Sequence, residues 1–467
     1  MLEGLEIEII SKSIIQKENE IFRIDSEFQL KEYIKSIDKI KERPYKNFDE
    51  YIELLTDGKH GGVELTDEGV IFLRTTNIKE NKIDLSDLRY ISNEESNETK
   101  RAEFSEKDLL LTTIGTIGLC VKVPKDFPRA TINQNLVRIV LKNKNYSSIV
   151  CCFLNSKFGR HQTLRFGAGN VYQMINYPNL KKIKIPKFTP QLSKIIDNLY
   201  VQSESKSSEA KSNYTKAETI LLDKIGLQSF EAIKEPVNIK GFRESFGSTG
   251  RLDAEYYQKK YDELELRITS QNYVRIKDIR SDNFRGLQPI YFENGNLDVI
   301  NSKHILDNTL DYDNFEKTSL EYWEKQEKAR VYKGDILTYT TGANIGRTQV
   351  YLKQSKALAS NHVNIIRLKQ ENPFYIGFVL NSLVGRLQTE KRSAGSAQAE
   401  LYPKDLDEFL IPIIDLKKQK QITKLVEESF KLKAESERLL EVAKQVVEMA
   451  IEVDEETAME FINKEGI

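Results

Sequence analysis

Two short loops in this chain of 467 residues carry side chains suited to reading another molecule through hydrogen bonds. Arg74-Thr75-Thr76-Asn77 follows a strand-like run, and Asn301-Ser302-Lys303-His304 takes the corresponding place in the second half. An arginine fork suits guanine O6 and N7, and a side-chain amide suits adenine N6 and N7. If both loops lie in a groove of DNA, they would read different bases, because their residues differ.

Further polar residues on predicted turns could position phosphates or reach base edges. Those in the two glycine-rich loops stand where a bare backbone lets a phosphate approach closely. Any one of them could be an ordinary solvated or turn residue, but for the whole set we favour DNA contact. The candidate DNA-binding residues are Lys59, His60, Arg74, Thr75, Asn77, Thr113, Thr116, Arg165, Asn170, Gln173, Arg285, Asn301, Lys303, His304, Thr341, Asn344, Arg392, Ser396 and Gln398.

No residue pattern marks a catalytic or metal site. The four histidines stand apart from one another, with neither metal-ligand spacing nor a Ser/His/Asp arrangement around them. The segment 372–375 (NPFY) lacks the second proline of a methyltransferase loop and predicts a helix start. The segment 342–348 (GANIGRT) departs from a phosphate-binding loop in spacing and has arginine in place of lysine, so it predicts a turn between strands. A degenerate carboxylate-and-lysine nuclease site stays open in so charged a chain. We predict no metal site.

Composition narrows the class of protein. With 39% hydrophobic and 30% charged residues, the chain has enough apolar residues for a core and much solvated surface. The formal net charge is −1, so a positive field for nucleic acid must be local or supplied by partners. Three cysteines cannot build a disulfide framework and indicate a reducing cytoplasm. No apolar run approaches the ~20 residues that span a bilayer, and the acidic start is unlike a signal peptide.

Two long runs without glycine or proline, 191–224 and 416–453, show heptad spacing. Their seams are in the same register, with Ile422 falling 226 residues after Ile196. Each seam contains Ser and Ala and is weak alone, so we expect the two helices to pair antiparallel. The predicted pairing residues are Ile196, Leu199, Ile220, Ile422, Leu425, Leu432, Leu439 and Val446.

The match between halves extends over nearly the whole chain. Arg23–Phe28 (RIDSEF) aligns with Arg251–Tyr256 (RLDAEY), and Asp108–Gly118 (DLLLTTIGTIG) with Asp335–Gly346 (DILTYTTGANIG). Alternating strand-like segments, a helical segment with Leu-Asn-Ser and a glycine-rich loop follow in the same order. The predicted fold class is therefore α+β. It has two tandem, pseudo-symmetric globular domains, each followed by a long helix, and the helices pair as an antiparallel coiled coil.

The predicted domain boundaries follow from the repeat. Residues 1–189 form the first globular domain, 190–227 the central helix and 228–235 a linker. Residues 236–414 form the second globular domain, 415–455 the C-terminal helix and 456–467 a tail. Each globular domain has enough residues to bury its own core.

The tandem arrangement resembles the specificity subunit of type I restriction–modification systems. The resemblance rests on RIDSEF and RLDAEYYQ, the two glycine-punctuated segments, Leu154–Thr163 and Leu380–Thr389 (LNSxxGRxQT), and RSAGSAQ before FLIP. Each motif is short and permissive, but their order, repeated twice, is specific. The resemblance implies that each globular domain is a target-recognition domain for one half of a bipartite, asymmetric DNA site. It also implies that the chain itself catalyses no reaction.

The same resemblance implies the partners. The long helices would set the spacing of the half-sites and dock two methyltransferase subunits, through which restriction/translocase subunits join. S-adenosylmethionine, and ATP with Mg where a translocase is present, would belong to those partners, so no cofactor is expected on this chain. Two alternatives remain: a specificity subunit of a type II-like enzyme without a translocase, or a coiled-coil protein-binding adaptor.

Overall fold

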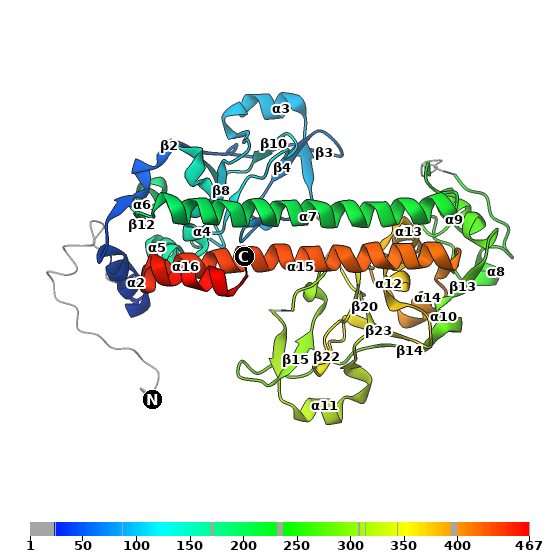
Figure 1. The fold of residues 1–467 in the computed structure, drawn as a ribbon. Coiled ribbons are helices and arrows are strands. Elements are labelled where there is room, and N and C mark those ends of the chain that lie inside the picture. Colours follow the sequence, from blue (N-terminus) through cyan, green and yellow to red (C-terminus); the bar gives the residue numbers. More distant parts are fainter. Residues whose placement is uncertain are drawn as a thin grey trace. The chain divides into compact units, whose positions relative to one another are not determined.

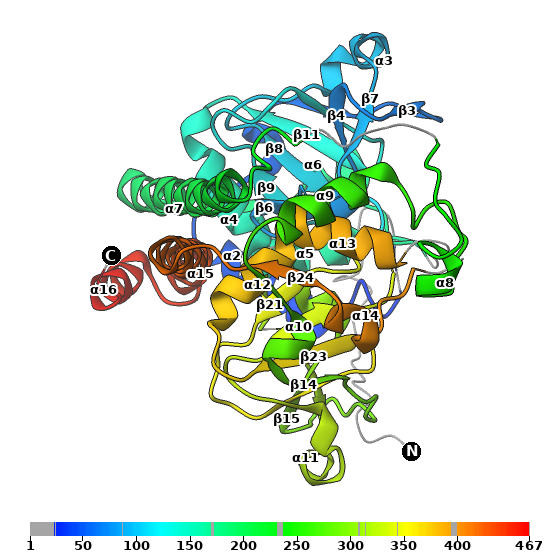
Figure 2. The ribbon, with the colours of Figure 1, turned by 90° about the vertical axis from the view of Figure 1, so that its right-hand side faces the viewer.

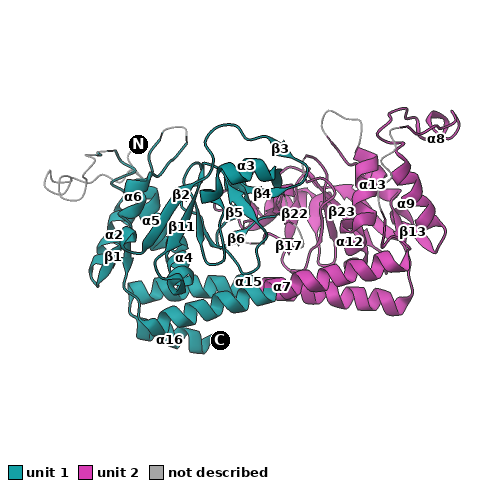
Figure 3. Cartoon of the chain, turned by 90° about the horizontal axis from the view of Figure 1, so that it is seen from above, with its two compact units in different colours: residues 1–206, 435–467 teal, residues 207–434 magenta. Residues whose placement is uncertain are grey.

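The computed structural model describes residues 23, 25–85, 87–169, 172–230, 237–306, 309–312, 314–342, 344–393 and 399–466. The chain divides into two compact units (Figure 3): unit 1 is Met1–Lys206 with Glu435–Ile467, and unit 2 is Ser207–Ala434. Each unit contains one head of strands and helices and a part of both long helices. We call residues 25–189 the first head and residues 237–414 the second head.

The predicted long helices are α7, Pro190–Lys224, and α15, Leu416–Glu452 (Figure 1). α7 begins on Pro190, at the predicted boundary, because the missing N–H of proline is not needed in a first turn. Past its last turn Gly226 has a φ of +68°, and Leu227 N–H donates to Leu222 O at 2.8 Å. This glycine cap fixes the end of the helix.

The C-terminal boundary differs from the prediction. α15 ends at Glu452 rather than at 455, and the predicted tail contains a further helix, α16, Glu455–Lys464. Asp454 caps α16 by accepting a hydrogen bond from Thr457 N–H at 2.8 Å. Ala458 and Ile462 of α16 are buried in the core of unit 1. The end of the chain is thus a folded part of that unit.

Small residues hold α7 and α15 together inside each unit. In unit 1 the Ser203 hydroxyl donates to Ser436 O at 2.9 Å, and the Ser436 hydroxyl donates to Ser203 O at 2.8 Å. In unit 2 the Ser429 hydroxyl donates to Ala210 O at 2.8 Å. From Ser203 to Ala210 the chain advances seven residues along α7, while the contacted residue of α15 moves back seven, from Ser436 to Ser429. The helices therefore run antiparallel, as predicted. Side chains this small let the two backbones approach closely.

The apolar stripe of each helix is wider than the predicted seam. Five of the predicted pairing residues are buried, but Ile220, Leu425 and Leu432 stay partly exposed. The buried set also includes residues outside the seam, among them Leu192, Tyr200, Val442 and Val447. These side chains face the head, because each helix packs against the other helix and against a head at the same time. Each long helix is therefore shared between the two compact units. The predicted boundaries had instead treated each long helix as a region of its own.

Two sheets of four strands form the first head. The antiparallel sheet has the order β2 (Ile52–Asp57), β11 (Leu136–Leu141), β8 (Leu109–Thr112), β9 (Cys120–Lys122). The second has the order β10 (Ala130–Ile132), β4 (Val70–Leu73), β7 (Arg89–Ile91), β3 (Leu65–Thr66). Shorter pairs are β1 (Tyr45–Asn47) with β12 (Lys184–Pro186), and β5 (Ile78–Lys79) with β6 (Lys82–Ile83). The helices are α2 (Lys31–Lys41), α3 (Asn93–Glu98), α4 (Ser147–Asn155), α5 (Lys157–Phe166) and α6 (Tyr177–Lys181).

The second head is built in the same way. Its antiparallel sheet has the order β14 (Arg280–Arg285), β23 (Val363–Leu368), β20 (Ile336–Tyr339), β21 (Thr348–Val350). The other has the order β18 (Glu316–Thr318), β15 (Leu297–Ile300), β22 (Ala357–Ala359), β19 (Arg330–Val331). The short pairs are β13 (Tyr273–Arg275) with β24 (Leu410–Pro412), and β16 (Ile305–Leu306) with β17 (Thr309–Leu310). The helices are α8 (Phe246–Thr249), α9 (Lys259–Thr269), α10 (Ile276–Ile279), α11 (Glu321–Lys325), α12 (Pro373–Asn381), α13 (Leu383–Ser393) and α14 (Pro403–Asp407).

The antiparallel sheets of the two heads share their strand order, and the other two sheets share three strands but differ at both edges. At one edge β19 pairs with β22, whereas no described strand pairs with the outer side of β10. In both, a parallel pair (β10 with β4, β22 with β15) is continued by an antiparallel strand, β7 or β18. β3 lies beyond β7, whereas segment 290–292 lies beside β18 through Phe292 N–H to Lys317 O at 2.9 Å. The predicted duplication is therefore confirmed at the level of topology.

Buried side-chain bonds recur at matching places in both heads. Asn155 accepts from Cys120 N–H at 2.9 Å, as Asn381 accepts from Thr348 N–H at 2.9 Å. These are the asparagines of the two Leu-Asn-Ser motifs, so the motif ties α4 or α12 to the neighbouring strand. α12 packs on β21 in this way (Figure 2). Asn372 caps α12, as the proline after it predicts, accepting from Phe374 N–H at 2.9 Å.

Each head also bonds to the long helix that does not directly follow it. The Lys157 N–H at the start of α5 donates to Glu448 of α15 at 2.6 Å. The Leu383 N–H at the start of α13 donates to Glu218 of α7 at 3.0 Å. A carboxylate at a helix N-terminus is favoured by the free N–H groups and the helix dipole.

Among the described helices, none is long and apolar enough to cross a membrane.

Candidate nucleic-acid interface

The predicted loops of the first head meet around residues 133–135, which we call the first hub. Asn133 N–H donates to Leu73 O at 2.9 Å, which fixes the start of the 74–77 loop. Both the N–H and the hydroxyl of Thr113 donate to Asn135 O at 3.0 Å. Gly61 N–H donates to Gln134 Oε1 at 3.3 Å. The loops that hold Lys59, Arg74 and Thr113 are thus brought to one place.

The glycine-rich loop joins the same cluster. Gly115 N–H donates to Gln173 O at 2.9 Å, and Ile175 N–H donates to Thr113 O at 3.0 Å. Ala168 and Met174 exchange backbone bonds of 2.9 and 2.8 Å across the loop. Tyr172, between them, is 72% exposed. The polar tips of the first head therefore form one continuous surface of backbone-anchored loops.

The second head gathers its loops around residues 360–362, the second hub. Ser360 N–H donates to Ile300 O at 3.0 Å, and Thr340 N–H and hydroxyl donate to His362 O at 3.1 and 2.9 Å. Leu401 N–H donates to Thr340 O at 2.9 Å, which brings in the end of the second glycine-rich loop. Arg285 reaches the same loop, donating to Leu401 O at 2.8 Å. The arrangement repeats that of the first hub with other side chains.

The two loops with the clearest recognition chemistry are short 3₁₀ turns whose fourth residue has a structural role. Asn77 is buried, accepts from Arg74 N–H at 3.0 Å and donates to Asp84 O at 3.0 Å. His304 is buried and accepts from Asn301 N–H through Nδ1 at 2.9 Å. Burial lowers the pKa of His304, so the ring is held neutral. The other turn positions, such as Arg74, Thr75, Asn301 and Lys303, retain partial or full exposure.

Most predicted cations are already paired with carboxylates. Lys59 bonds to Glu95 at 2.5 Å and Glu98 at 2.9 Å, and these bonds raise the pKa of its ammonium. Arg74 pairs with Asp87 at 2.7 Å. Arg285 pairs with Glu400 at 2.5 Å, and Lys303 pairs with Glu316. The hydrogen bonds from Tyr402 and then Arg285 lower the pKa of Glu400. Phosphates would have to exchange with these carboxylates, in keeping with the low net charge.

The remaining predicted residues divide into buried, exposed and undescribed. Arg165 is buried, donates to Phe28 O at 2.9 Å and lies 4.4 Å from the Phe28 ring centroid, which gives it a structural role. Thr113 is also buried, and Arg392 donates to Glu408 O at 3.3 Å. His60 and Thr116 are exposed, while Gln173, Thr341 and Asn344 are partly exposed. Asn170, Ser396 and Gln398 lie outside the described residues. DNA contact by each of these stays a prediction.

The hubs themselves were not among the predicted residues. Gln134 is exposed, as are Asn361 and His362. A signal was present, because both hubs are polar runs separated by one residue from the matching segments VRIVLK and NIIRLK. Their backbones hold the loops, so their side chains become the central candidates for base contact.

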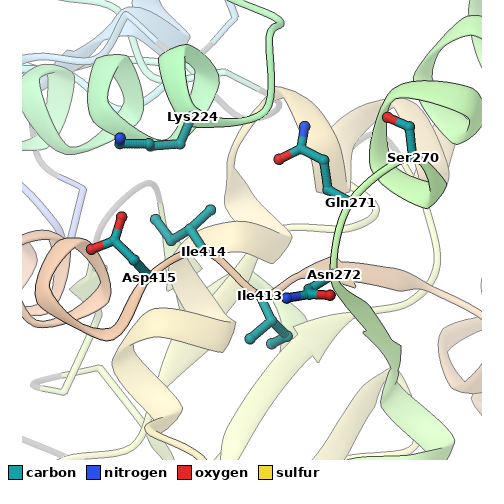
Figure 4. Close-up of a pocket in the computed structure, with 7 residues that line it drawn as sticks. All are labelled: Lys224, Ser270, Gln271, Asn272, Ile413, Ile414 and Asp415. Atoms are coloured by element: carbon teal, nitrogen blue, oxygen red, sulfur yellow. The ribbon is translucent and has the colours of Figure 1, made fainter.

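A pocket of about 490 Å³ lies in unit 2, where the ends of α7 and α9 meet the segment between β24 and α15 (Figure 4). Lys224, Gln271 and Asp415 are among its lining residues. In unit 1 the corresponding place is filled by Arg43, which donates to Ala450 O and Ile451 O at the end of α15. Gln271 is the counterpart of Arg43 and is too short for that role. The pocket therefore reflects this difference between the two units.

A family comparison agrees with this architecture. Residues 274–443 match the model of the type I restriction modification DNA specificity domain. The matched region runs through most of the second head and most of α15, and it supports the family resemblance drawn from the sequence.

Individual relatives are distant. Over 89 residues the chain is 34% identical to the type I restriction enzyme EcoBI specificity subunit of Escherichia coli, a match that covers 19% of this chain and 18% of that protein. The type I restriction–modification S subunit from M. genitalium is similar in structure, with 12% identity, a TM-score of 0.39, and coverage of 88% of this chain and 95% of that one. The HsdS subunit from Thermoanaerobacter tengcongensis has 15% identity, a TM-score of 0.29, and coverage of 88% and 97%.

Proposed function

We propose that this chain is the DNA sequence-specificity subunit of a type I restriction–modification complex and catalyses no reaction itself. The observation that carries the proposal is the pair of hubs. Two heads of one topology each gather polar loops around a hub, and the hub side chains differ: Asn133, Gln134 and Asn135 in one, Asn361 and His362 in the other. Equivalent scaffolds with unlike reading residues suit a bipartite, asymmetric DNA target, one half per head.

The long helices have the partner-binding and spacing role in this proposal. Two methyltransferase subunits dock on them, and restriction/translocase subunits join through these. S-adenosylmethionine, and ATP with Mg, are bound by the partners, and the complex works in the cytoplasm. If the paired helices set the distance between half-sites, that distance is near one turn of DNA, roughly 34 Å.

The test is to sequence the methylated bases of a host with and without the gene. A bipartite motif should disappear on deletion. In the intact complex Gln134→Ala should reduce discrimination among bases in the first half-site alone, and His362→Ala should do so in the second alone. Each substitution should weaken binding to the target by roughly 1–3 kcal/mol, and methylation of the target should fall with it. Binding should also fall steeply with salt, because phosphate contacts release counterions. Deletion without loss of any motif, or binding that ignores DNA sequence and salt, would contradict the proposal.

A further inference from the structure

The second head exposes a short apolar segment between β14 and β15. Leu287 is 42% exposed, Ile290 64%, Tyr291 38% and Phe292 46%. The corresponding loop of the first head, residues 58–69, is mainly glycine and polar residues. Clustered exposed apolar side chains on a soluble protein mark a contact surface. The contrast indicates a contact made by the second head through this loop.

The segment is continuous with the proposed DNA interface. Leu287 N–H donates to Ala359 O at 3.1 Å, directly beside the second hub. At the other end the Tyr291 hydroxyl donates to Asn301 Oδ1 at 2.8 Å, and Gln288 Nε2 donates to the same hydroxyl at 2.7 Å. The apolar side chains therefore lie between the hub and the 301–304 loop. A ligand that covers both of these also covers the segment, so its occupant is the same DNA duplex.

The backbone of the segment is held beside the edge strand β18. Besides the Phe292 bond to β18, the Thr318 hydroxyl donates to Ile290 O at 2.7 Å. Gly295 closes the turn, where an added Cβ would lie 2.6 Å from Thr318 N. Segment 290–292 is thus fixed along the outer edge of β18, whose other side pairs with β15.

We propose that Leu287 and Ile290 contact the C5-methyl groups of thymine in the half-site of the second head. This inference rests on the proposed function and adds a chemical rule to it. The thymine methyl is the apolar feature that the major groove presents, and aliphatic side chains recognise it by contact. The neighbouring Asn301 and His362 supply hydrogen bonds, whereas these two residues supply the apolar part of the reading. The second half-site accordingly contains at least one A·T pair.

Replacement of thymine by uracil removes only the methyl group and tests the contact directly. The full chain, purified with its partner subunits, is titrated with duplexes that carry uracil in one half-site at a time. Uracil in the second half-site should weaken wild-type binding about fourfold for each methyl group removed from the interface. Leu287→Ala and Ile290→Ala should weaken binding to thymine duplexes and bind thymine and uracil duplexes alike. Uracil in the first half-site should affect wild type and variants equally.

Leu266→Ala is the matched control, because Leu266 is an aliphatic residue 68% exposed on α9. It should keep the wild-type preference for thymine. The inference is overturned if the loop variants still prefer thymine as wild type does, if they weaken binding while wild type ignores uracil, or if the second half-site lacks an A·T pair. These outcomes leave sequence-specific binding by both heads intact, whereas loss of all specificity would contradict the proposed function and the inference together.

Discussion

At the scale of single residues, each head contains a buried aspartate that forms an ion pair with an arginine. Asp108 is fully buried and bonds to Arg138 at 2.8 Å and Lys144 at 2.9 Å. Asp335 takes the same place in the second head, with Arg367 at 2.8 Å. Each aspartate opens one of the glycine-punctuated segments of the repeat. The repeat thus preserves an ion pair beneath the strand that leads to a recognition loop.

Asp108→Asn should therefore destabilise unit 1 by about 3 kcal/mol, because it leaves a partly buried arginine without its carboxylate. The midpoint of denaturant unfolding measures the loss. Glu321→Gln is a control at an exposed ion pair with Lys325, where the change should be slight. An Asp108→Asn protein as stable as the control variant would contradict the structural role of the aspartate.

His304 predicts a dependence of stability on pH. Burial lowers its pKa from the usual 6.5, so below that pH the unfolded chain takes up a proton that the folded head resists. The contribution of His304 to stability is complete above pH 6.5 and declines as the pH falls from there towards the lowered pKa. His304→Asn, which copies Asn77 of the first head, should flatten this decline. If the stability of wild type and of His304→Asn falls equally with pH below pH 6.5, burial of a neutral His304 does not cause the decline.

The polar residues of the loops could be predicted from sequence, but their individual roles could not. Arg74 and Asn77 stand three residues apart on the same turn, and both are good base-reading types. The structure uses the amide of Asn77 to close the turn and leaves Arg74 at the surface. Arg165 was also predicted to contact DNA, but its guanidinium is buried against Phe28, which lies 137 positions away in the chain. Which polar group is needed inside depends on contacts between distant segments that no local pattern encodes.

At the scale of elements, the long helices depend on small residues where they touch. Ser203 and Ser436 are buried and bond to each other's carbonyl groups, which leaves no room for a larger side chain. Ser203→Leu should overpack this contact and destabilise unit 1 by roughly 1–3 kcal/mol. Val201→Leu, at a 53% exposed position of the same helix, should change stability little. Thermal unfolding of both variants measures the difference, and equal melting temperatures would argue against close helix contact at Ser203.

The elements were predictable where the repeat or the heptad spacing was clear, and less so at the ends. The glycines of the repeated segments have a physical reason: an added Cβ at Gly118 or Gly346 would lie 2.6 Å from Cγ2 of Thr163 or Thr389. That match between halves is readable in the sequence once the halves are aligned. α16 has no counterpart among the described residues of the first repeat's helix, so alignment did not indicate it. The apolar spacing of Ala458 and Ile462 behind the Asp454 cap was the signal available.

At the scale of the whole molecule, the paired helices are the part that we propose sets the distance between half-sites. One added heptad in each helix lengthens the pair by about 10 Å and preserves the seam. The spacer between half-sites should then grow by about three base pairs, at ~3.4 Å per pair. Methylome sequencing of a host with the lengthened chain measures the spacer. An unchanged spacer would show that the helices do not set it.

The central claim is that each head reads its own half of the target. Replacement of residues 40–190 by the head of a relative with a different target, followed by sequencing of the methylated bases, tests it most directly. We predict a motif whose first half is new and whose second half is unchanged. A motif altered in both halves, or in neither while the complex still methylates DNA, would contradict the claim.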